Sequence, residues 1–209
     1  MSDGGNGNRV ALVAGSGGLL SDAIADRLRA EGFSVGRLED GDLSHRTQTI
    51  AAAERIAGSL GRVSVLVTIP TLHDAAPFGE MSSPRWGRLL EAHLGATTNA
   101  CAAVVPAMVR AGQGTVITIS SWLALAGIAG EAYYAAATGS ILAFTKSFAL
   151  EVAAKGVRVN GIAVGPLEPA PTDGAYVLPG EVADTVMFLV NDAGFFVGQV
   201  LVASGGALV

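Results

Sequence analysis

The sequence predicts an α/β domain with a doubly wound, mostly parallel sheet of about six strands and helices on both faces. Short β-branched runs alternate along the 209 residues with longer segments of helical periodicity. Hydrophobic residues make up 50% of the chain but aromatic residues only 6%, so small side chains must fill the core. No linker or repeat interrupts the alternation. We therefore expect one domain over residues 1–209, with the polar, glycine-rich residues 1–8 as a flexible tail.

Six runs have the composition of buried strands, because each is short, apolar and bounded by polar residues, glycine or proline. The first, RVALVA at 9–14, ends at a group of glycines. The others are expected at 33–38, 63–69, 115–120, 157–164 and 199–203. Segments long enough for helices separate them, and such connections join parallel strands.

Five segments between these strands have the periodicity or composition of helices. They are expected at 22–31, 47–60, 84–110, 132–154 and 181–190. Gly32 ends the first of them. The segments 84–110 and 132–154 are rich in alanine, valine and leucine and carry few charges, so we expect part of their surface to be buried between subunits.

The composition excludes several classes of function. A net charge of -5 without a basic stripe argues against a nucleic-acid partner. The mean hydropathy is +0.48, but no apolar run is long enough to cross a bilayer, so no membrane partner is expected. The single Cys101 excludes an intrachain disulfide and, with no secretory signal, favours a cytoplasmic location. Three scattered histidines, His45, His73 and His93, lack metal-ligand spacing, so no metal site is expected.

Four motifs, in order along nearly the whole chain, resemble the short-chain dehydrogenase/reductase family. They are AGSGGLLSDAIADRLRAEG at 14–32, GDLS at 41–44, the segment from TVITISS to VGP at 115–166, and VGQVLVASGG at 197–206. The resemblance implies a Rossmann-type fold, an oxidoreductase ancestry and a nicotinamide dinucleotide as the ancestral cofactor.

The glycine-rich turn keeps three glycines that the resemblance assigns to cofactor binding, namely Gly15, Gly17 and Gly18. Leu19 and Ser21 stand at the next two family glycine positions. Leu19 brings a branched side chain to the place where a pyrophosphate approaches bare backbone, and Asp22 competes with a phosphate for the helix dipole. The alternative is an ordinary strand-to-helix turn in which Ser21 caps the helix.

The adenine side of the cofactor cleft is also altered. Too few residues lie between Val35 and Asp42 for the helix and strand that the family inserts there, so one edge of the sheet is expected to be trimmed. Arg37 lies where it could meet a 2′-phosphate, which would select NADP(H) if any dinucleotide binds; alternatively it is a solvated arginine. Asp42 marks the adenine position. Residues 68–71 read TIPT in place of the family's Asn-Asn-Ala-Gly run, and Pro70 lacks an amide donor. We therefore expect no cofactor.

The resemblance places catalysis at Ser121 and Tyr134, which have the family's thirteen-residue spacing. Thr138 stands where the family has its lysine, and His93 stands at its asparagine position. Each residue also has a purely structural explanation. Ser121 would end a strand and bond to nearby backbone, Tyr134 would pack in a helix, and His93 would be a satisfied core or interface histidine.

The loss of the lysine has a calculable cost. A free tyrosine has a pKa near 10, and lowering it to about 7 requires roughly 4 kcal/mol. A cation about 4 Å away supplies that amount at an effective dielectric near 20. Thr138 is neutral, and Lys146 lies too far along the chain to replace the lysine. Tyr134 is therefore expected to be a hydrogen-bond donor and a poor base.

Three functional hypotheses follow. The first is a non-catalytic or weakly active partner subunit of an oxidoreductase assembly. It would pair with itself or with an active relative through the helices 84–110 and 132–154, which the family uses for this purpose, and could keep a small-molecule ligand. The second is an NAD(P)H-dependent carbonyl reductase with an atypical site. The third is a cofactor-independent Ser/Tyr enzyme similar to the halohydrin dehalogenases. The proline-rich segment 166–181 is expected to be a short crossing rather than a lid.

Overall fold

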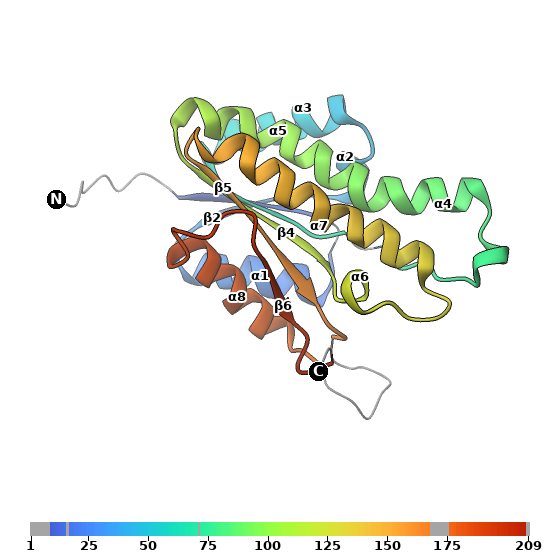
Figure 1. Cartoon of the computed structure of the whole chain (residues 1–209). Helices are drawn as coiled ribbons and strands as arrows, with labels where there is room; N and C mark the ends of the chain where they lie inside the picture. The colour runs from blue at the N-terminus through green and yellow to red at the C-terminus, as the bar shows by residue number, and fades with distance from the viewer. Residues whose placement is uncertain (1–8, 16, 71, 168–175, 208–209) are drawn as a thin grey trace.

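Six parallel strands make up the sheet in this computed structural model, which describes residues 9–15, 17–70, 72–167 and 176–207. Their order is β2-β1-β3-β4-β5-β6 (Figure 1). The strands are β1 Val10–Ala14, β2 Ser34–Leu38, β3 Val63–Thr68, β4 Gly114–Ser121, β5 Val157–Val164 and β6 Val200–Ala203. Each lies within one residue of its expected position, so the predicted fold class is confirmed. The expected tail at 1–8 lies outside the described residues.

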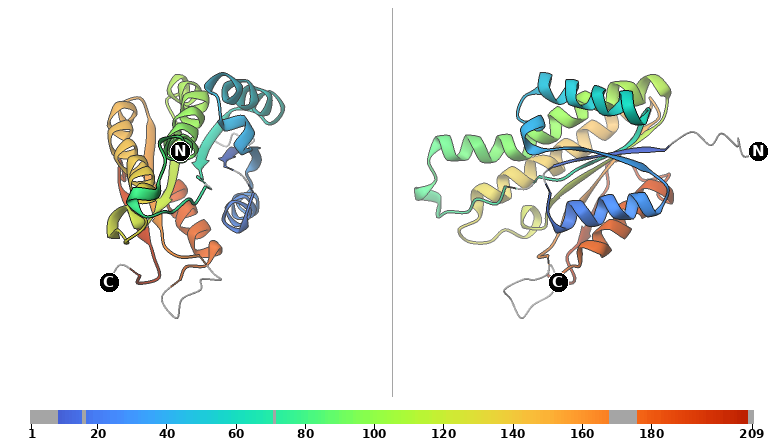
Figure 2. Two further views of the ribbon diagram at one scale, coloured as in Figure 1. Left: turned by 90° about the vertical axis from the view of Figure 1, so that its right-hand side faces the viewer. Right: turned by 180° about the vertical axis from the view of Figure 1, so that it is seen from behind.

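Helices cover both faces of the sheet (Figures 1 and 2). One face packs against α1 Leu19–Ala30 and α8 Pro179–Asn191. The other packs against α3 Arg46–Leu60, α5 Ala96–Ala111 and α7 Ala132–Ala153. Alternate residues of β1 enter the two cores: Ala11 and Val13 face α1, and Leu12 faces the opposite layer. A strand that is buried on both sides must be apolar throughout, which explains its sequence.

Few helices and no further strand lie beyond β2 at the edge of the described sheet, as the sequence predicts. Between Leu38 and Val63, where every residue is described, the chain forms only the four-residue helix α2 Asp40–Leu43 and α3. No strand lies in that interval, and β2 is therefore the edge strand.

The helix expected at 84–110 is not one regular α-helix, and this prediction was wrong in that respect. It consists of α4 Ser83–Leu90, a π-helical turn η2 at Glu91–Gly95, and α5. A π turn widens the helix locally and is common at functional sites. His93 lies inside it. Three short helices were not expected, namely α2, η1 Phe78–Glu80 and α6 Leu123–Ala126.

The crossing expected at 166–181 falls largely outside the described residues. Its two described ends meet, since Leu167 and Val177 form an isolated parallel bridge and the Val177 amide donates to the carbonyl oxygen of Pro166 over 2.8 Å. Pro179 then begins α8 at the position where a proline costs no hydrogen bond. Among the described residues, none of the helices combines the length and the apolar character that crossing a membrane requires.

Candidate functional site

A cavity of about 260 Å³ lies where β4 and β5 end and α7 begins. Ligands of open α/β sheets bind outside the carboxyl ends of the strands, which is where this cavity lies. Its lining brings together residues from both ends of the chain: Leu20, Ile69, Pro70, His73, Ile119, Ser120, Ser121, Trp122, Leu123, Tyr134, Thr138, Val164, Gly165, Pro166 and Leu167.

A larger hollow of about 630 Å³ lies at the amino ends of the strands and is a weaker candidate. Arg9, Arg62 and Arg158 line it. Arg158 has a structural role, because its guanidinium donates to the carbonyl oxygens of Leu189 and Val190 at the end of α8, 2.8 and 2.9 Å away. Such contacts satisfy the free carbonyls of a helix C-terminus.

Ser121 and Tyr134 both line the cavity, as the sequence predicts. Ser121 ends β4, and its hydroxyl accepts a hydrogen bond from the Leu123 amide over 3.2 Å, which is the structural role left open for it. Burial raises the pKa of Tyr134; a hydrogen bond with Ser121 opposes this, and the charge of Glu131 adds to it. The phenol is therefore protonated at neutral pH and can donate a hydrogen bond.

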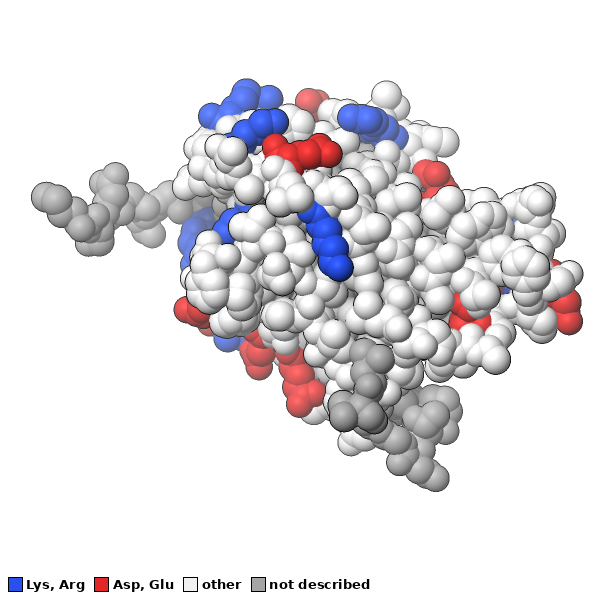
Figure 3. All heavy atoms as spheres, viewed as in Figure 1, with Lys and Arg blue, Asp and Glu red and all other residues white. Residues whose placement is uncertain are grey.

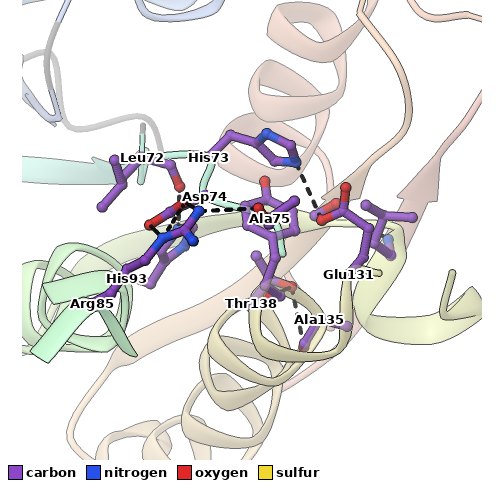
Figure 4. Close-up of polar contacts among 12 residues, drawn as sticks. Leu72, His73, Asp74, Ala75, Arg85, His93, Glu131, Ala135 and Thr138 are labelled. Atoms are coloured by element: carbon purple, nitrogen blue, oxygen red, sulfur yellow. Dashed lines mark hydrogen bonds and ion pairs between the residues drawn. The ribbon is translucent and has the colours of Figure 1, made fainter. Parts of the chain in front are cut away.

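Thr138 is buried beside Tyr134 but does not serve it chemically. Its hydroxyl donates to the carbonyl oxygens of Tyr134 and Ala135, 2.9 and 3.2 Å away, within its own helix (Figure 4). None of the described residues lining the cavity is a lysine or an arginine. No permanently charged side chain of the described lining can therefore lower the pKa of the phenol.

His93 is buried in the π turn, with its ring centroid 5.4 Å from that of Tyr134. Its Nε2 donates to the carbonyl oxygen of Leu72 over 2.7 Å, which leaves Nδ1 as an acceptor. Nδ1 is buried without a hydrogen-bond partner in the described chain. Burial lowers the pKa of His93, the bond to Leu72 opposes the shift, and the charge of His73 adds to it. The ring is thus neutral.

His73 also lines the cavity, although in the sequence it is one of three histidines without ligand spacing. Its ring centroid lies 4.6 Å from that of Tyr134 in an edge-to-face contact. Its Nε2 lies 3.3 Å from Oε2 of Glu131, the residue that precedes α7 (Figure 4). Only its place just after β3, at the ligand-binding edge of the sheet, could have indicated this role.

The loop that carries His73 is fixed on both sides of that residue (Figure 4). Before it, the Leu72 carbonyl is held by His93. After it, the Asp74 carboxylate binds Arg85, whose Nε lies 2.7 and 3.0 Å from the two carboxylate oxygens. That hydrogen bond, together with the charge of Arg85, lowers the pKa of Asp74. His73 is therefore presented by an ordered segment.

Ser21 does not cap α1, contrary to the alternative interpretation of the glycine turn. Gly18 precedes α1, and Ser21 is the third helical residue, buried with no partner for its hydroxyl, so the capping expectation was wrong. Leu19 is the first helical residue and is 65% exposed. Among the described residues, a Cβ on Gly17 would meet no atom within 4 Å, so this part of the chain leaves open space beside the backbone of the turn.

The two adenine-side residues already have protein partners. Arg37 donates to Asp22 over 2.7 Å, so its guanidinium is not a free site for a 2′-phosphate. Asp42 accepts from the Glu39 amide over 3.2 Å and stabilises the start of α2. The space beside the glycine turn fits a dinucleotide, whereas Thr138, in the lining of the cavity, offers a neutral hydroxyl that is already bonded to its own helix.

Buried polar atoms without a hydrogen-bond partner gather at this edge of the sheet. In the described chain they are Ser21 Oγ, Thr68 Oγ1, His93 Nδ1 and Glu131 Oε2. Ser21 lies in the first turn of α1 and Thr68 ends β3, both at the carboxyl side of the strands, and His93 and Glu131 lie around Tyr134. Buried polar atoms normally have partners, so this concentration indicates a site that is completed by water or a ligand.

Comparison with known proteins gives consistent results. The family model described as short chain dehydrogenase matches residues 6–175. The 3-oxoacyl-(acyl-carrier-protein) reductase FabG of Chlamydia trachomatis is 30% identical over 182 residues, which cover 79% of this chain and 73% of that protein. Nodulation protein G of Azospirillum brasilense is 29% identical, and the alignment covers 95% of this chain and 97% of that protein. It extends over 239 positions, so the relative has segments that these 209 residues lack. A solved structure titled NAD+-bound xylitol dehydrogenase superposes with a TM-score of 0.88 at 22% identity, covering 97% of this chain and all of that one.

Proposed function

The chain belongs to the short-chain dehydrogenase family of oxidoreductases, and from this membership we propose that it is a partner subunit of an oxidoreductase assembly with weak or no hydride-transfer activity of its own. The observation that carries the proposal is the hydrogen bonding of Thr138. Its hydroxyl donates hydrogen bonds to the carbonyl oxygens of Tyr134 and Ala135. Among the described lining residues, no lysine or arginine takes the place of the missing lysine.

The energetic consequence follows from the pKa of the phenol. A general acid–base group works best with a pKa near the operating pH. Burial moves the pKa of Tyr134 upward, away from neutrality. Without a nearby cation, ionising the phenol costs more than the roughly 4 kcal/mol of an unperturbed tyrosine. Tyr134 then holds a substrate oxygen but does not exchange protons with it at a useful rate.

We propose weak dinucleotide binding rather than none. The solved relative titled as NAD+-bound gives no support to the expectation that no cofactor binds. The open space at Gly17 and the start of α1 suit a pyrophosphate. Binding of NADP(H) through Arg37 would have to break the ion pair with Asp22, which reduces the gain from the 2′-phosphate.

The proposed partner surface is formed by α5 and α7. This face shows few charged side chains (Figure 3). The rings of Phe144 and Phe148 stack on it with centroids 5.0 Å apart, and they line a hollow of about 460 Å³ together with Val105 and Val109. Leu150 is 77% exposed on α7. Apolar side chains at this density on two adjacent helices are typical of an interface between subunits.

Calorimetric titration with NADH and NADPH, combined with light scattering after size exclusion, tests both parts. We expect dissociation constants in the millimolar range, no reduction of a panel of ketones with either cofactor, and an oligomer. A variant carrying Phe144→Ser and Phe148→Ser should be monomeric while it keeps the same dinucleotide affinity.

Submillimolar binding with turnover of a ketone would show that the chain is an atypical carbonyl reductase and would overturn the proposal. A wild-type monomer over the concentration range of the titration would overturn the role as a partner subunit.

A further inference from the structure

We propose that His73, oriented by Glu131, is an acid–base residue of the cavity and that, with Tyr134 as hydrogen-bond donor, it enolises a small ketone without a dinucleotide. This activity goes beyond the partner-subunit proposal, but it uses the same cavity. It requires neither the missing lysine nor the glycine turn.

The first support is the way in which His73 is held. The loop residue before it is fixed by His93, and the residue after it is fixed by the ion pair with Arg85. A flexible loop histidine would need neither restraint. Groups that act in catalysis are generally positioned by a second set of contacts that locks their orientation.

The second support is the pairing of His73 with a carboxylate. Nε2 of His73 lies 3.3 Å from Glu131, whose side chain is only 18% exposed. The pair has ion-pair distance but not hydrogen-bond geometry, so the carboxylate favours the tautomer with the proton on Nε2 through its charge alone, and Nδ1 becomes the basic atom. The His73 side chain is 58% exposed, so solvent reaches it.

The third support is the state of Tyr134. A phenol with a raised pKa gives up its proton poorly, but it can still stabilise an enolate oxygen by donating a hydrogen bond. Its ring contacts His73 directly, and both residues line the cavity. The other walls include Ile69, Ile119 and Val164, which are apolar. A volume of about 260 Å³ admits a small neutral molecule.

The reaction is a proton transfer that needs no external oxidant or reductant. His73 Nδ1 takes the proton from the carbon next to the carbonyl, and the electron pair of that C–H bond forms the new C=C bond. The π pair of the carbonyl moves to oxygen, which accepts the hydrogen bond from the Tyr134 hydroxyl. Return of the proton from His73 to carbon restores the ketone, and in heavy water it returns as deuterium.

The charged and titratable groups around His73 come from its own loop, from α4, from the π turn, and from α7 with the residue before it. They are Asp74, Arg85, Arg88, His93, Glu131 and Tyr134. Asp74 is bound to Arg85, and His93 is buried and neutral, so Glu131 is the carboxylate that acts on His73 directly.

The test follows the α-hydrogens of cyclohexanone in heavy water by proton NMR, with the full-length protein and no dinucleotide. Wild type should accelerate the exchange above buffer, and His73→Gln should lose at least about 100-fold of that acceleration. Tyr134→Phe should lose a similar factor. Glu131→Gln should lose less. His45→Gln, at an exposed position before α3, serves as the matched control and should exchange as wild type does.

Equal exchange by wild type and His73→Gln would overturn the proposal, as would wild-type exchange no faster than buffer. Thermal unfolding of each variant separates loss of function from loss of folding, and His73→Asn provides a second variant if His73→Gln does not fold. Calorimetry with NADPH distinguishes this proposal from the previous one, because His73→Gln should leave the dinucleotide affinity unchanged.

Discussion

The hydroxyl of Thr138 donates a hydrogen bond to the carbonyl oxygen of Tyr134, 2.9 Å away and one helical turn earlier. The Thr138 side chain therefore forms its hydrogen bonds with the helix backbone rather than with a molecule in the cavity. Its exposure is 1%, so the hydroxyl has no competing water, and the bond fixes its rotamer. The phenol of Tyr134 is left to its buried surroundings, which raise its pKa.

Replacing Thr138 by lysine should lower the pKa of Tyr134, which burial raises in the wild type. An ammonium group within about 4 to 6 Å of the phenol favours its ionised form and should lower the pKa of Tyr134 by about 1 to 3 units. Ultraviolet absorbance of the phenolate across a pH titration measures this, with Tyr134→Phe in the same background to identify the signal. Thr138→Val is the matched control, since it removes the hydroxyl without adding charge. An unchanged titration in Thr138→Lys would contradict the expectation.

The ion pair of Arg37 with Asp22 should limit the affinity for NADPH. In Asp22→Asn the guanidinium is free to meet a 2′-phosphate, so we expect several-fold tighter binding of NADPH and little change for NADH. Because the pair is partly exposed, its loss should change the free energy of unfolding by no more than about 1 kcal/mol. Calorimetry with both dinucleotides gives the comparison. Equal gains for NADH and NADPH would show that Arg37 does not meet the phosphate.

His93 should make the protein less stable in mild acid. Burial lowers its pKa in the folded state below the unfolded value of about 6.5, so the unfolded chain binds a proton first as the pH falls. The stability that depends on a neutral His93 is fully present above pH 6.5. Below that pH the free energy of unfolding falls by up to about 1.4 kcal/mol per pH unit, until the pKa of the folded state is reached. Urea unfolding between pH 8 and 5 measures this range.

The variant His93→Gln should lack this component, so the difference in stability between wild type and variant should shrink as the pH falls. His45→Gln controls for the loss of a histidine elsewhere. Parallel pH curves for wild type and His93→Gln would show that the buried ring does not resist protonation.

The strands could be predicted to within a residue because period and composition are local properties of the chain. The β1 segment, for instance, must be apolar at every position since both of its faces are buried. The π turn around His93 has no comparable local pattern. Ser121, Tyr134 and Thr138 were located by their spacing along the chain, and the structure places them at one cavity.

The contacts that decide the chemistry are long-range, and the sequence did not reveal them. His73 lies 61 positions before Tyr134 and 58 before Glu131, and no spacing rule joins a loop to the start of a distant helix. The ion pair between Asp22 and Arg37 was likewise not predicted. In the sequence Asp22 was considered only for its effect on the helix dipole, and Arg37 only as a ligand of a 2′-phosphate.

Two glycines of the turn should respond oppositely to the same substitution. Gly15 has φ +134, and a Cβ there would lie 2.0 Å from the carbonyl oxygen of Ile69. Gly15→Ala therefore combines backbone strain with a clash against main chain and should cost about 2 kcal/mol or more. Gly17 is outside the left-handed region, and an added Cβ would meet nothing within 4 Å. Gly17→Ala should leave the stability unchanged or raise it by about 0.4 to 1 kcal/mol.

The same pair also tests the phosphate turn. A methyl group at Gly17 projects into the open space beside the backbone, where a pyrophosphate must approach closely. Gly17→Ala should therefore weaken NADPH binding at full stability, which Gly15→Ala cannot show because it affects folding. Urea unfolding and calorimetry on the two variants separate these effects. If Gly17→Ala binds NADPH as wild type does, the dinucleotide does not use this turn.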